Sequence, residues 1–282
     1  MQDIFAYNDI ARELRYFFQE KQGFVEVPPQ PHLSILTVCE NPKTVVPFQH
    51  GAHSYPLPQT AHSGLEAALL KNPRLPGVFC ISTSYRNEPH PLPGRHDNIF
   101  PLFEFGSHGT IDDLRQLESD LLAFLGFSSA HHISYESQCA AYRTPILEAA
   151  HEKHLQKAFG DVISLEYFPT RTHPFWNIKQ GNPETYHKIN VLLHGVPTIG
   201  SAERSCDTKQ MRDNFCRTSG GEYAEFLFKT FGEKRVRQEL EAYLAQAFFP
   251  RFGGGIGITR LARAMKLAGL IETANTTSLQ TA

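Results

Sequence analysis

Two β-rich runs, residues 78–85 and 100–105, are separated by a loop that suits neither a helix nor a strand. The loop contains Pro89, Pro91 and Pro93, and each proline removes a backbone donor from a strand ladder. The two runs are therefore predicted to pair as an antiparallel strand–long loop–strand unit. A chain organised around such a unit is expected to build an antiparallel sheet.

Helical and strand patterns cover much of the remaining chain. Helices are predicted at residues 8–22, 111–125, 137–159 (interrupted or kinked at Pro145), 234–248 and 258–270. Further strands are predicted at residues 24–27, 163–168, 175–178 and 189–193. The strand at 24–27 ends in a proline cluster that includes Pro28, so it belongs at a sheet edge or an interface.

These elements predict an α+β fold, with a six- or seven-stranded antiparallel sheet flanked by helices. No linker rich in Gly, Ser or Pro forces a boundary, so residues 1–271 are expected to form a single domain. Residues 272–282 are small and polar and are expected to form a disordered tail.

Composition narrows the class of protein. The formal net charge is -2, so no overall positive field attracts nucleic acid or anionic lipid. The cysteines are odd in number and form no C-x-x-C pair, which is typical of reduced thiols in a cytoplasmic protein. The N-terminal residues do not resemble a signal peptide, and no apolar run is long enough to span a membrane.

The residues around the proline-rich loop suggest a phosphate and purine site. Arg86 can neutralise a phosphate, and Glu88, two residues later, would share its sheet face and could accept from an exocyclic amine. Arg95 and His96 lie in the loop, where they could reach outer phosphates, and Phe100 could stack on a purine ring. A surface Arg–Glu pair and a core phenylalanine are the alternatives.

A glycine run near the C-terminus suggests a second contact with the same ligand. Residues 253–257 predict a glycine turn through which the backbone could approach a ligand closely, and Arg260 opens the helix that follows. A glycine-rich turn beside a surface arginine is the alternative. Glu104 would face the same way as Phe100 and could bind the ammonium group of an amino acid. Lys179 and Lys188 are interpreted as solvated.

Taken together, the motifs resemble those of the catalytic core of class II aminoacyl-tRNA synthetases, in the aspartyl/asparaginyl/lysyl subgroup. Residues 23–27 with the prolines resemble motif 1. Motif 2 is matched by Arg86, Glu88, Arg95, His96 and Phe100, and motif 3 by residues 255–260. Residues 57–60 and 200–204 resemble the stretches that hold the amino acid in the aspartyl enzymes. The resemblance covers about residues 8 to 270.

The resemblance implies a site and a mechanism. The catalytic residues would be Arg86, on the α-phosphate, and Arg260, which would sandwich adenine together with Phe100. The ATP site implied is Arg86, Glu88, Arg95, His96, Phe100, Gly255, Gly257 and Arg260. The amino-acid site implied is Gln59, His62, Glu104, Ser201, Glu203 and Arg204. An amino-acid carboxylate would attack the α-phosphate and leave an aminoacyl-adenylate, through positioning and charge stabilisation alone.

Two departures from the subgroup bear on function. Asn190 and Pro197 stand where an Asp and a Glu usually contact ATP through Mg²⁺, a cation that prefers charged oxygen ligands. Glu203, Glu104 or Glu222 could substitute, or the phosphates could hold the metal. In addition, the chain leaves no room for the anticodon-binding barrel of the tRNA ligases, so tRNA is not expected as the acceptor.

A stand-alone core of this kind is similar to the archaeal asparagine synthetase related to asparaginyl-tRNA synthetase. The leading hypothesis is an ATP-dependent, AMP-forming ligase that passes an aspartate-like acyl group to ammonia or a small amine. One alternative is aminoacylation of a protein or a biosynthetic intermediate, and another is a non-catalytic binding or regulatory subunit. A conventional tRNA ligase ranks last. A homodimer is expected through the first helix and the Pro28 strand.

Overall fold

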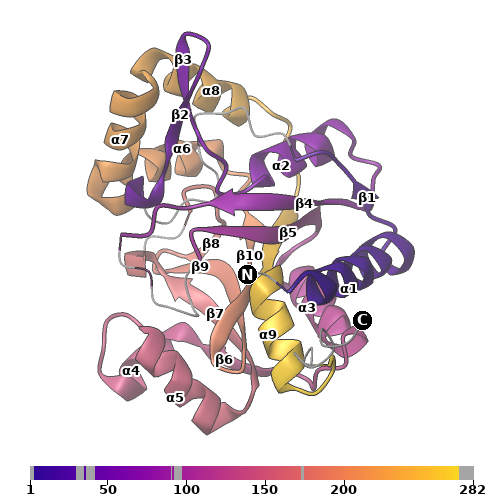
Figure 1. Ribbon diagram of the computed structural model, residues 1–282. Helices are drawn as coiled ribbons and strands as arrows, with labels where there is room; N and C mark the ends of the chain where they lie inside the picture. The colour runs from indigo at the N-terminus through magenta and orange to yellow at the C-terminus, as the bar shows by residue number, and fades with distance from the viewer. Residues whose placement is uncertain are drawn as a thin grey trace.

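The structure is a computed structural model that describes residues 3–29, 35, 42–89, 91, 97–172 and 175–272. In these residues, a nine-stranded sheet has the order β1-β4-β5-β11-β10-β9-β7-β6, with β8 paired to β9 (Figure 1). Its strands are β1 (Val25–Glu26), β4 (Gly77–Tyr85), β5 (Ile99–His108), β6 (His131–Ser134), β7 (Val162–Pro169), β8 (Gln180–Asn182), β9 (Thr185–Leu193), β10 (Val196–Arg204) and β11 (Arg251–Gly257). A separate hairpin consists of β2 (Pro47–His50) and β3 (His53–Pro56).

Helices surround this sheet (Figure 1). They are α1 (Ile4–Arg15), continued by the π-helical η1 (Tyr16–Lys21), α2 (His62–Lys71), α3 (Ile111–Phe124), α4 (Tyr135–Tyr142), α5 (Ala149–Phe159), α6 (Thr208–Arg217), α7 (Glu222–Phe231), α8 (Glu233–Leu244) and α9 (Ile258–Leu267). Short 3₁₀ turns are η2 (Pro42–Thr44), η3 (Thr170–Thr172) and η4 (Thr218–Gly221). In the described residues, no helix is long and apolar enough to cross a bilayer.

The main hydrophobic core lies between one face of the sheet and the helices α1, α3 and α9. Phe18, from the α1–η1 helix, packs against Phe79, Phe103 and Phe105 of the central strands, with ring centroids 4.8 to 6.2 Å apart. A second core holds α6, α7 and α8 together around the buried Trp176. The site described below lies on the other face of the central strands, where α2 covers part of β4 through a smaller cluster that includes Leu65, Leu69 and Val78.

The α+β prediction is confirmed, although the sheet has more strands than the six or seven expected. The runs on either side of the proline loop form the antiparallel pair β4–β5. The helix predicted at 111–125 is α3, whose N-terminus has a capping box at Thr110 that satisfies otherwise unpaired backbone donors. β1 is an edge strand, as its prolines indicated, and it runs parallel to β4.

The helix predicted across 137–159, with an interruption or kink at Pro145, is indeed interrupted there: α4 ends at Tyr142, Arg143 follows in a left-handed conformation, and α5 begins at Ala149, after Pro145. Two local predictions are wrong. The strand at 175–178 is reduced to a single bridge between Ile178 and Arg204. The glycine turn is part of strand β11, because its backbone pairs with β5 on one side and β10 on the other.

Candidate active site

The candidate site lies on the sheet face opposite the main core. Side chains alternate between faces along a strand, and Phe103 and Phe105 of β5 point into the core. Their neighbours Leu102 and Glu104 therefore point to the other face, where Leu102 pairs with Gly257 and Glu104 with Gly255. The glycines at these positions of the central strand add no side chain to this face, and the nearest side-chain atoms are those of Leu102 at Gly255 and of Arg260 at Gly257.

One end of this face holds the aromatic and basic residues of the predicted nucleotide site. The guanidinium of Arg86 lies 5.5 Å from the centre of the Phe100 ring. Phe100 is two residues from Leu102, the register partner of Gly257. Arg260 extends over Gly257, and its Nη1 donates to the Pro197 carbonyl at 2.7 Å. The three residues expected to hold a purine triphosphate thus lie at the same end of one face.

The chain around Arg86 differs in detail from the sequence-based prediction. Arg86 and Glu88 lie just beyond the end of β4 and not on the strand. The Arg86 amide donates to the Asn98 carbonyl at 2.7 Å, and the Glu88 amide donates to the Asn98 side chain, so Asn98 holds the segment that follows β4. Because both residues lie beyond the strand, strand alternation does not by itself place their two side chains on one face. Arg95 and His96 lie outside the described residues.

The middle of the face supports the segment that leads into α2. Glu104 is buried and accepts from the hydroxyl of Thr60, from the Ala61 amide at 2.8 Å and from Ser82 Oγ at 2.5 Å. Burial raises the pKa of Glu104, and it is the largest of the effects on this pKa. Both carboxyl oxygens are engaged within the protein, so the geometry assigns Glu104 to positioning residues 60–61. Contact with a substrate ammonium stays a prediction.

Two further predicted residues, Gln59 and His62, are buried in the same region. Gln59 Nε2 donates to Thr44 Oγ1 at 2.9 Å, and the Gln59 carbonyl accepts from Ser84. The His62 ring covers Gly253 so closely that a methyl group on this glycine would collide with it. Burial, and then the nearby arginines Arg204 and Arg251, lower the pKa of His62 well below its usual value. His62 is therefore neutral at pH 7.

At the far end of the face lies a buried ion pair that the sequence did not suggest. Arg251 Nη2 lies 2.5 Å from Glu66 Oε1, and both side chains are almost completely buried. The hydroxyl of Tyr243, from α8, donates to the second Glu66 oxygen at 2.8 Å. Helix α2, strand β11 and helix α8 are thereby fixed to one another. The charge of Arg251 is neutralised inside the protein.

Arg204 lies beside this pair and retains an unused donor. Its side chain is 2% exposed, and its Nη1 makes a long contact of 3.4 Å to Asn177 Oδ1. In the described part of the chain, Arg204 Nε is buried without a hydrogen-bond partner. An unsatisfied buried guanidinium nitrogen is costly, and an anionic ligand would remove that cost. Burial lowers the pKa of Arg204 from its usual value, which adds to the demand for an anion.

Ser201 and Glu203 are not brought together with the other predicted substrate residues. They alternate with Ala202 and Arg204 along β10 and point to the opposite face. Ser201 Oγ donates to Glu118 at 2.6 Å, and Glu203 accepts from Lys179 Nζ at 2.7 Å. Both residues are committed to contacts beneath the sheet, so neither contributes to the site as described.

The donor set for magnesium does not fit a metal held by the protein. Asn190 lies on the site face, where it pairs with Gly200, but Pro197 offers only a carbonyl, which Arg260 engages. Glu203 points away and Glu222 begins α7, outside the sheet. Over the described ranges, no group of three His, Cys, Asp or Glu residues could hold an ion.

Sequence reasoning missed Glu66, Arg251 and Tyr243. A helical glutamate, an arginine before a glycine run and a helical tyrosine carry no joint signal, because 177 residues or more separate Glu66 from the other two. Only the sheet register and the packing of α2 and α8 bring them together. Arg251 lies two residues before Gly253, the first glycine of the run, and that proximity is the one local signal that could have attracted attention.

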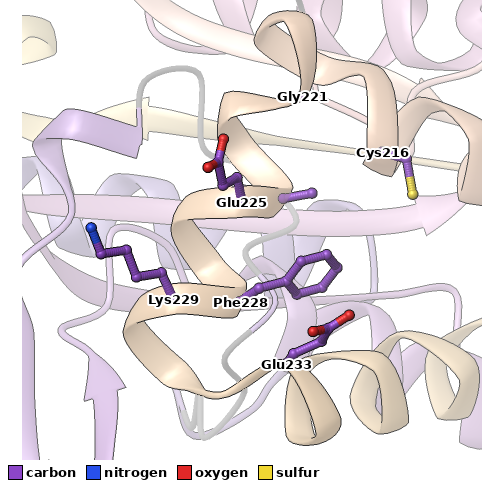
Figure 2. Close-up of a pocket in the computed structure, with 7 residues that line it drawn as sticks. Cys216, Gly221, Glu225, Phe228, Lys229 and Glu233 are labelled. Carbon is purple, nitrogen blue, oxygen red and sulfur yellow. The ribbon is translucent and has the colours of Figure 1, made fainter.

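A surface depression of about 500 Å³ lies away from this face, among α6, η4, α7 and α8 (Figure 2). Its lining includes Phe228 and Lys229, with Glu225, Glu233 and the free thiol of Cys216 around the rim. None of the motif residues lines it. The functional assignment therefore rests on the sheet face and not on this depression.

The fold is that of class II aminoacyl-tRNA synthetase catalytic cores, of the aspartyl and asparaginyl kind. An asparaginyl-tRNA synthetase from Pyrococcus horikoshii, solved with asparaginyl-adenylate, matches 93% of this chain with a TM-score of 0.76 and 16% sequence identity. An asparaginyl-tRNA synthetase from Entamoeba histolytica, also with asparaginyl-adenylate, matches 94% with a TM-score of 0.69 and 16% identity. The aspartyl-tRNA synthetase of that organism matches 92% with a TM-score of 0.65 and 17% identity.

This chain covers 64%, 63% and 55% of the lengths of those three structures, which is less than two thirds of each. No protein-family model matches the sequence, and no curated protein matches it either. At such low identities the likeness concerns the fold. The class II part of the sequence-based resemblance is thus confirmed at the level of fold, and the chemistry is argued below.

Proposed function

We propose that the protein is an ATP-dependent ligase that activates an amino acid as an aminoacyl-adenylate. The single observation that carries this proposal is the alignment, on one sheet face, of the Arg86–Phe100 pair at one end and the unsatisfied Arg204 at the other. Arg204 pairs with Arg251, which pairs with His108 of β5, and His108 lies eight residues from Phe100, or roughly 26 Å along the strand. An elongated ligand with a purine at one end and an acidic group at the other fits this layout.

The chemistry follows from charge placement. A carboxylate oxygen of the amino acid would attack the α-phosphorus of ATP, and the bond to pyrophosphate would break. Arg86 would neutralise charge on the α-phosphate while Phe100 and Arg260 hold the base. An amine would then attack the acyl carbon, AMP would leave, and the amine would lose a proton to form an amide. No covalent enzyme intermediate is needed, so the contribution of the protein is orientation and electrostatics.

We further propose that the amino acid is aspartate-like and that ammonia or a small amine is the acceptor. The buried Arg204 supports an acidic side chain, because Arg251, the neighbouring arginine, is already neutralised by Glu66. The magnesium that class II synthetases use with ATP would have to be held mainly by the phosphates here. Aminoacylation of a protein or a biosynthetic intermediate remains the alternative outcome for the acyl group.

The test is product analysis with each amino acid, ATP, Mg²⁺ and ammonium. AMP, pyrophosphate and an amide are expected with an acidic amino acid, and Arg204→Met is expected to abolish the preference for it. Arg212→Met, which removes a guanidinium from an exposed ion pair with Glu241, serves as the matched control. ADP as the sole nucleotide product, or no turnover with any amino acid, would refute the ligase. Parallel reactions with tRNA and with candidate proteins, read by mass shift, identify other acceptors.

A non-catalytic binding subunit is the second candidate, and the absence of an acidic trio at the site, over the described residues, favours it. This candidate predicts calorimetric binding of the nucleotide or the amino acid without pyrophosphate exchange. Exchange above background with any amino acid would rule it out.

A further inference from the structure

Thr44, the last residue of the short turn η2, is buried although it belongs to none of the sequence motifs. It is 5% exposed, and the next residue, Val45, packs in the core that holds α6, α7 and α8 together. The chain then enters the hairpin of β2 and β3, where the Tyr55 ring lies 4.5 Å from the guanidinium of Arg235 on α8. The helices therefore hold the segment that carries Thr44 in a fixed position.

The side chain of Thr44 contacts the segment expected to bind the amino acid. Thr44 Oγ1 accepts from Gln59 Nε2 at 2.9 Å, and both residues are buried. A glutamine amide donates through its nitrogen and accepts through its oxygen, so this bond determines which end of the amide faces Thr44. The Gln59 oxygen is thereby directed away from Thr44, in an orientation in which it could accept from the ammonium of an amino acid.

The backbone of Thr44 contacts the segment expected to bind the nucleotide. The Thr44 carbonyl accepts from the Asn87 amide at 2.8 Å. Asn87 stands between Arg86 and Glu88, and the amides of these two neighbours donate to Asn98. Three consecutive residues, including the arginine expected on the α-phosphate, are thus held by Thr44 and Asn98 together.

The two segments also meet directly through their backbones. The Tyr85 amide donates to the Pro58 carbonyl at 2.8 Å, and Ser84 Oγ donates to the Gln59 carbonyl at 2.8 Å. These bonds fix the path of the chain around Gln59 without fixing its side-chain amide. Loss of the Thr44 hydroxyl should therefore release the amide while the backbone frame stays in place.

We propose that Thr44 is a positioning residue that couples the amino-acid segment to the nucleotide segment, so that each substrate binds more tightly when the other is present. This inference rests on the proposed function and adds to it a residue outside the motifs and a direction of cooperativity. When Arg86 engages the α-phosphate, Asn87 fixes the Thr44 carbonyl, and the Thr44 hydroxyl then orients the Gln59 amide. Coupling of this kind is reciprocal, so the amino acid favours nucleotide binding by the same factor.

The test measures this coupling by calorimetry. Aspartate, or whichever amino acid supports pyrophosphate exchange, is titrated into the protein alone and into the protein saturated with α,β-methylene-ATP, which cannot release pyrophosphate. In the wild type the analogue should tighten amino-acid binding by at least about fivefold. Thr44→Val removes the hydroxyl at nearly constant shape and should reduce that factor to less than about twofold.

The same variant should weaken amino-acid binding to the analogue complex by about 5- to 50-fold, because a buried amide donor loses its partner. In pyrophosphate exchange the loss should appear in KM for the amino acid more than in kcat. A structural role alone would lower the Tm and leave the coupling factor unchanged.

Three comparisons separate positioning from general destabilisation. Thr44→Ser keeps the hydroxyl and should retain most of the coupling. On a Gln59→Leu background, Thr44→Val should cause no further loss of coupling, because the hydroxyl acts through that side chain. Thr218→Val removes another buried hydroxyl, which donates to the Asn214 carbonyl of α6, and it should leave the coupling unchanged.

The outcomes distinguish this inference from the proposed function. Unchanged coupling in Thr44→Val, or the same loss in Thr44→Ser, would overturn the inference and leave the proposed ligase intact. Thr44→Ala is read in the same way if valine prevents folding. A wild-type protein that binds both ligands independently would also overturn the inference alone. A wild-type protein that binds neither ligand and shows no exchange with any amino acid would overturn both.

Discussion

Replacing Glu66 with glutamine tests the buried ion pair that fixes the far end of the site. Glu66 accepts from Arg251 Nε at 2.6 Å and from the Tyr243 hydroxyl at 2.8 Å, and all three groups are buried. Glutamine has nearly the same shape and keeps an oxygen acceptor. The substitution Glu66→Gln therefore removes charge with little change of volume. It leaves the guanidinium of Arg251 buried without its counter-ion.

The magnitude follows from the geometry. Two opposite charges about 4 Å apart attract by about 4 kcal/mol at an effective dielectric constant of 20. Loss of one partner from a buried pair costs about 3–5 kcal/mol in measured cases. Because the amide oxygen can still accept from Tyr243, we expect the lower end, a fall of about 3 kcal/mol in the free energy of unfolding. That is a large share of the total stability of a typical domain.

The assay is urea unfolding followed by the fluorescence of Trp176, the only tryptophan in the chain. Trp176 is buried and lies edge-on to Tyr243, with ring centroids 5.1 Å apart, so it reports on this region. Combining Glu66→Gln with Arg251→Met should recover at least about half of the loss, because no uncompensated charge is then buried. Glu241→Gln, in an exposed pair, should leave stability within error.

Two results would refute this reasoning. A loss below about 1 kcal/mol for Glu66→Gln would mean that the pair behaves like a solvent-exposed one. A double variant that is as unstable as the sum of its single variants would mean that Arg251 contributes through packing alone, without charge coupling to Glu66.

Three other outcomes are expected. Burial raises the pKa of Glu118 from 4.5 to about 8, so its share of stability is full below pH 4.5 and falls as the pH rises toward 8. Glu118→Gln should flatten that slope in urea unfolding by up to about 1.4 kcal/mol per pH unit, and parallel slopes would contradict the assignment. Gly255→Ala should weaken ATP binding, measured by calorimetry, while the Tm stays unchanged. Gly253→Ala should lower the Tm, because the added methyl group would collide with the His62 ring. Equal effects of the two variants on binding and Tm would contradict the assignment of Gly255 to the ligand-facing part of the sheet. Phe5 of α1 is 72% exposed, and we expect it to lie at a homodimer contact. Phe5→Asp should therefore halve the molecular mass measured by light scattering. A wild-type protein that is already monomeric would contradict this expectation.

Local sequence signals were sufficient for the elements that carry the motifs. The β4–β5 pair and α3 were predicted because β-rich composition, loop prolines and helical periodicity are patterns that act over a few neighbouring residues. Arg86, Phe100 and Arg260 were selected for the same reason, since each lies in a short motif. The glycine run was misread as a turn because its pairing partners on β5 and β10 lie far away in the sequence.

The sequence by itself determined the α+β class and the strand–loop–strand unit, and it supplied the residues proposed for the nucleotide end of the site. Only the tertiary structure decided which face each residue occupies and which charges are buried. Ser201 and Glu203 face away from Arg204 because alternation along β10 separates them, and Lys188 is buried because two distant aromatic rings enclose it. Burial and charge compensation depend on contacts between strands and helices that are far apart in the chain, and no local pattern records them.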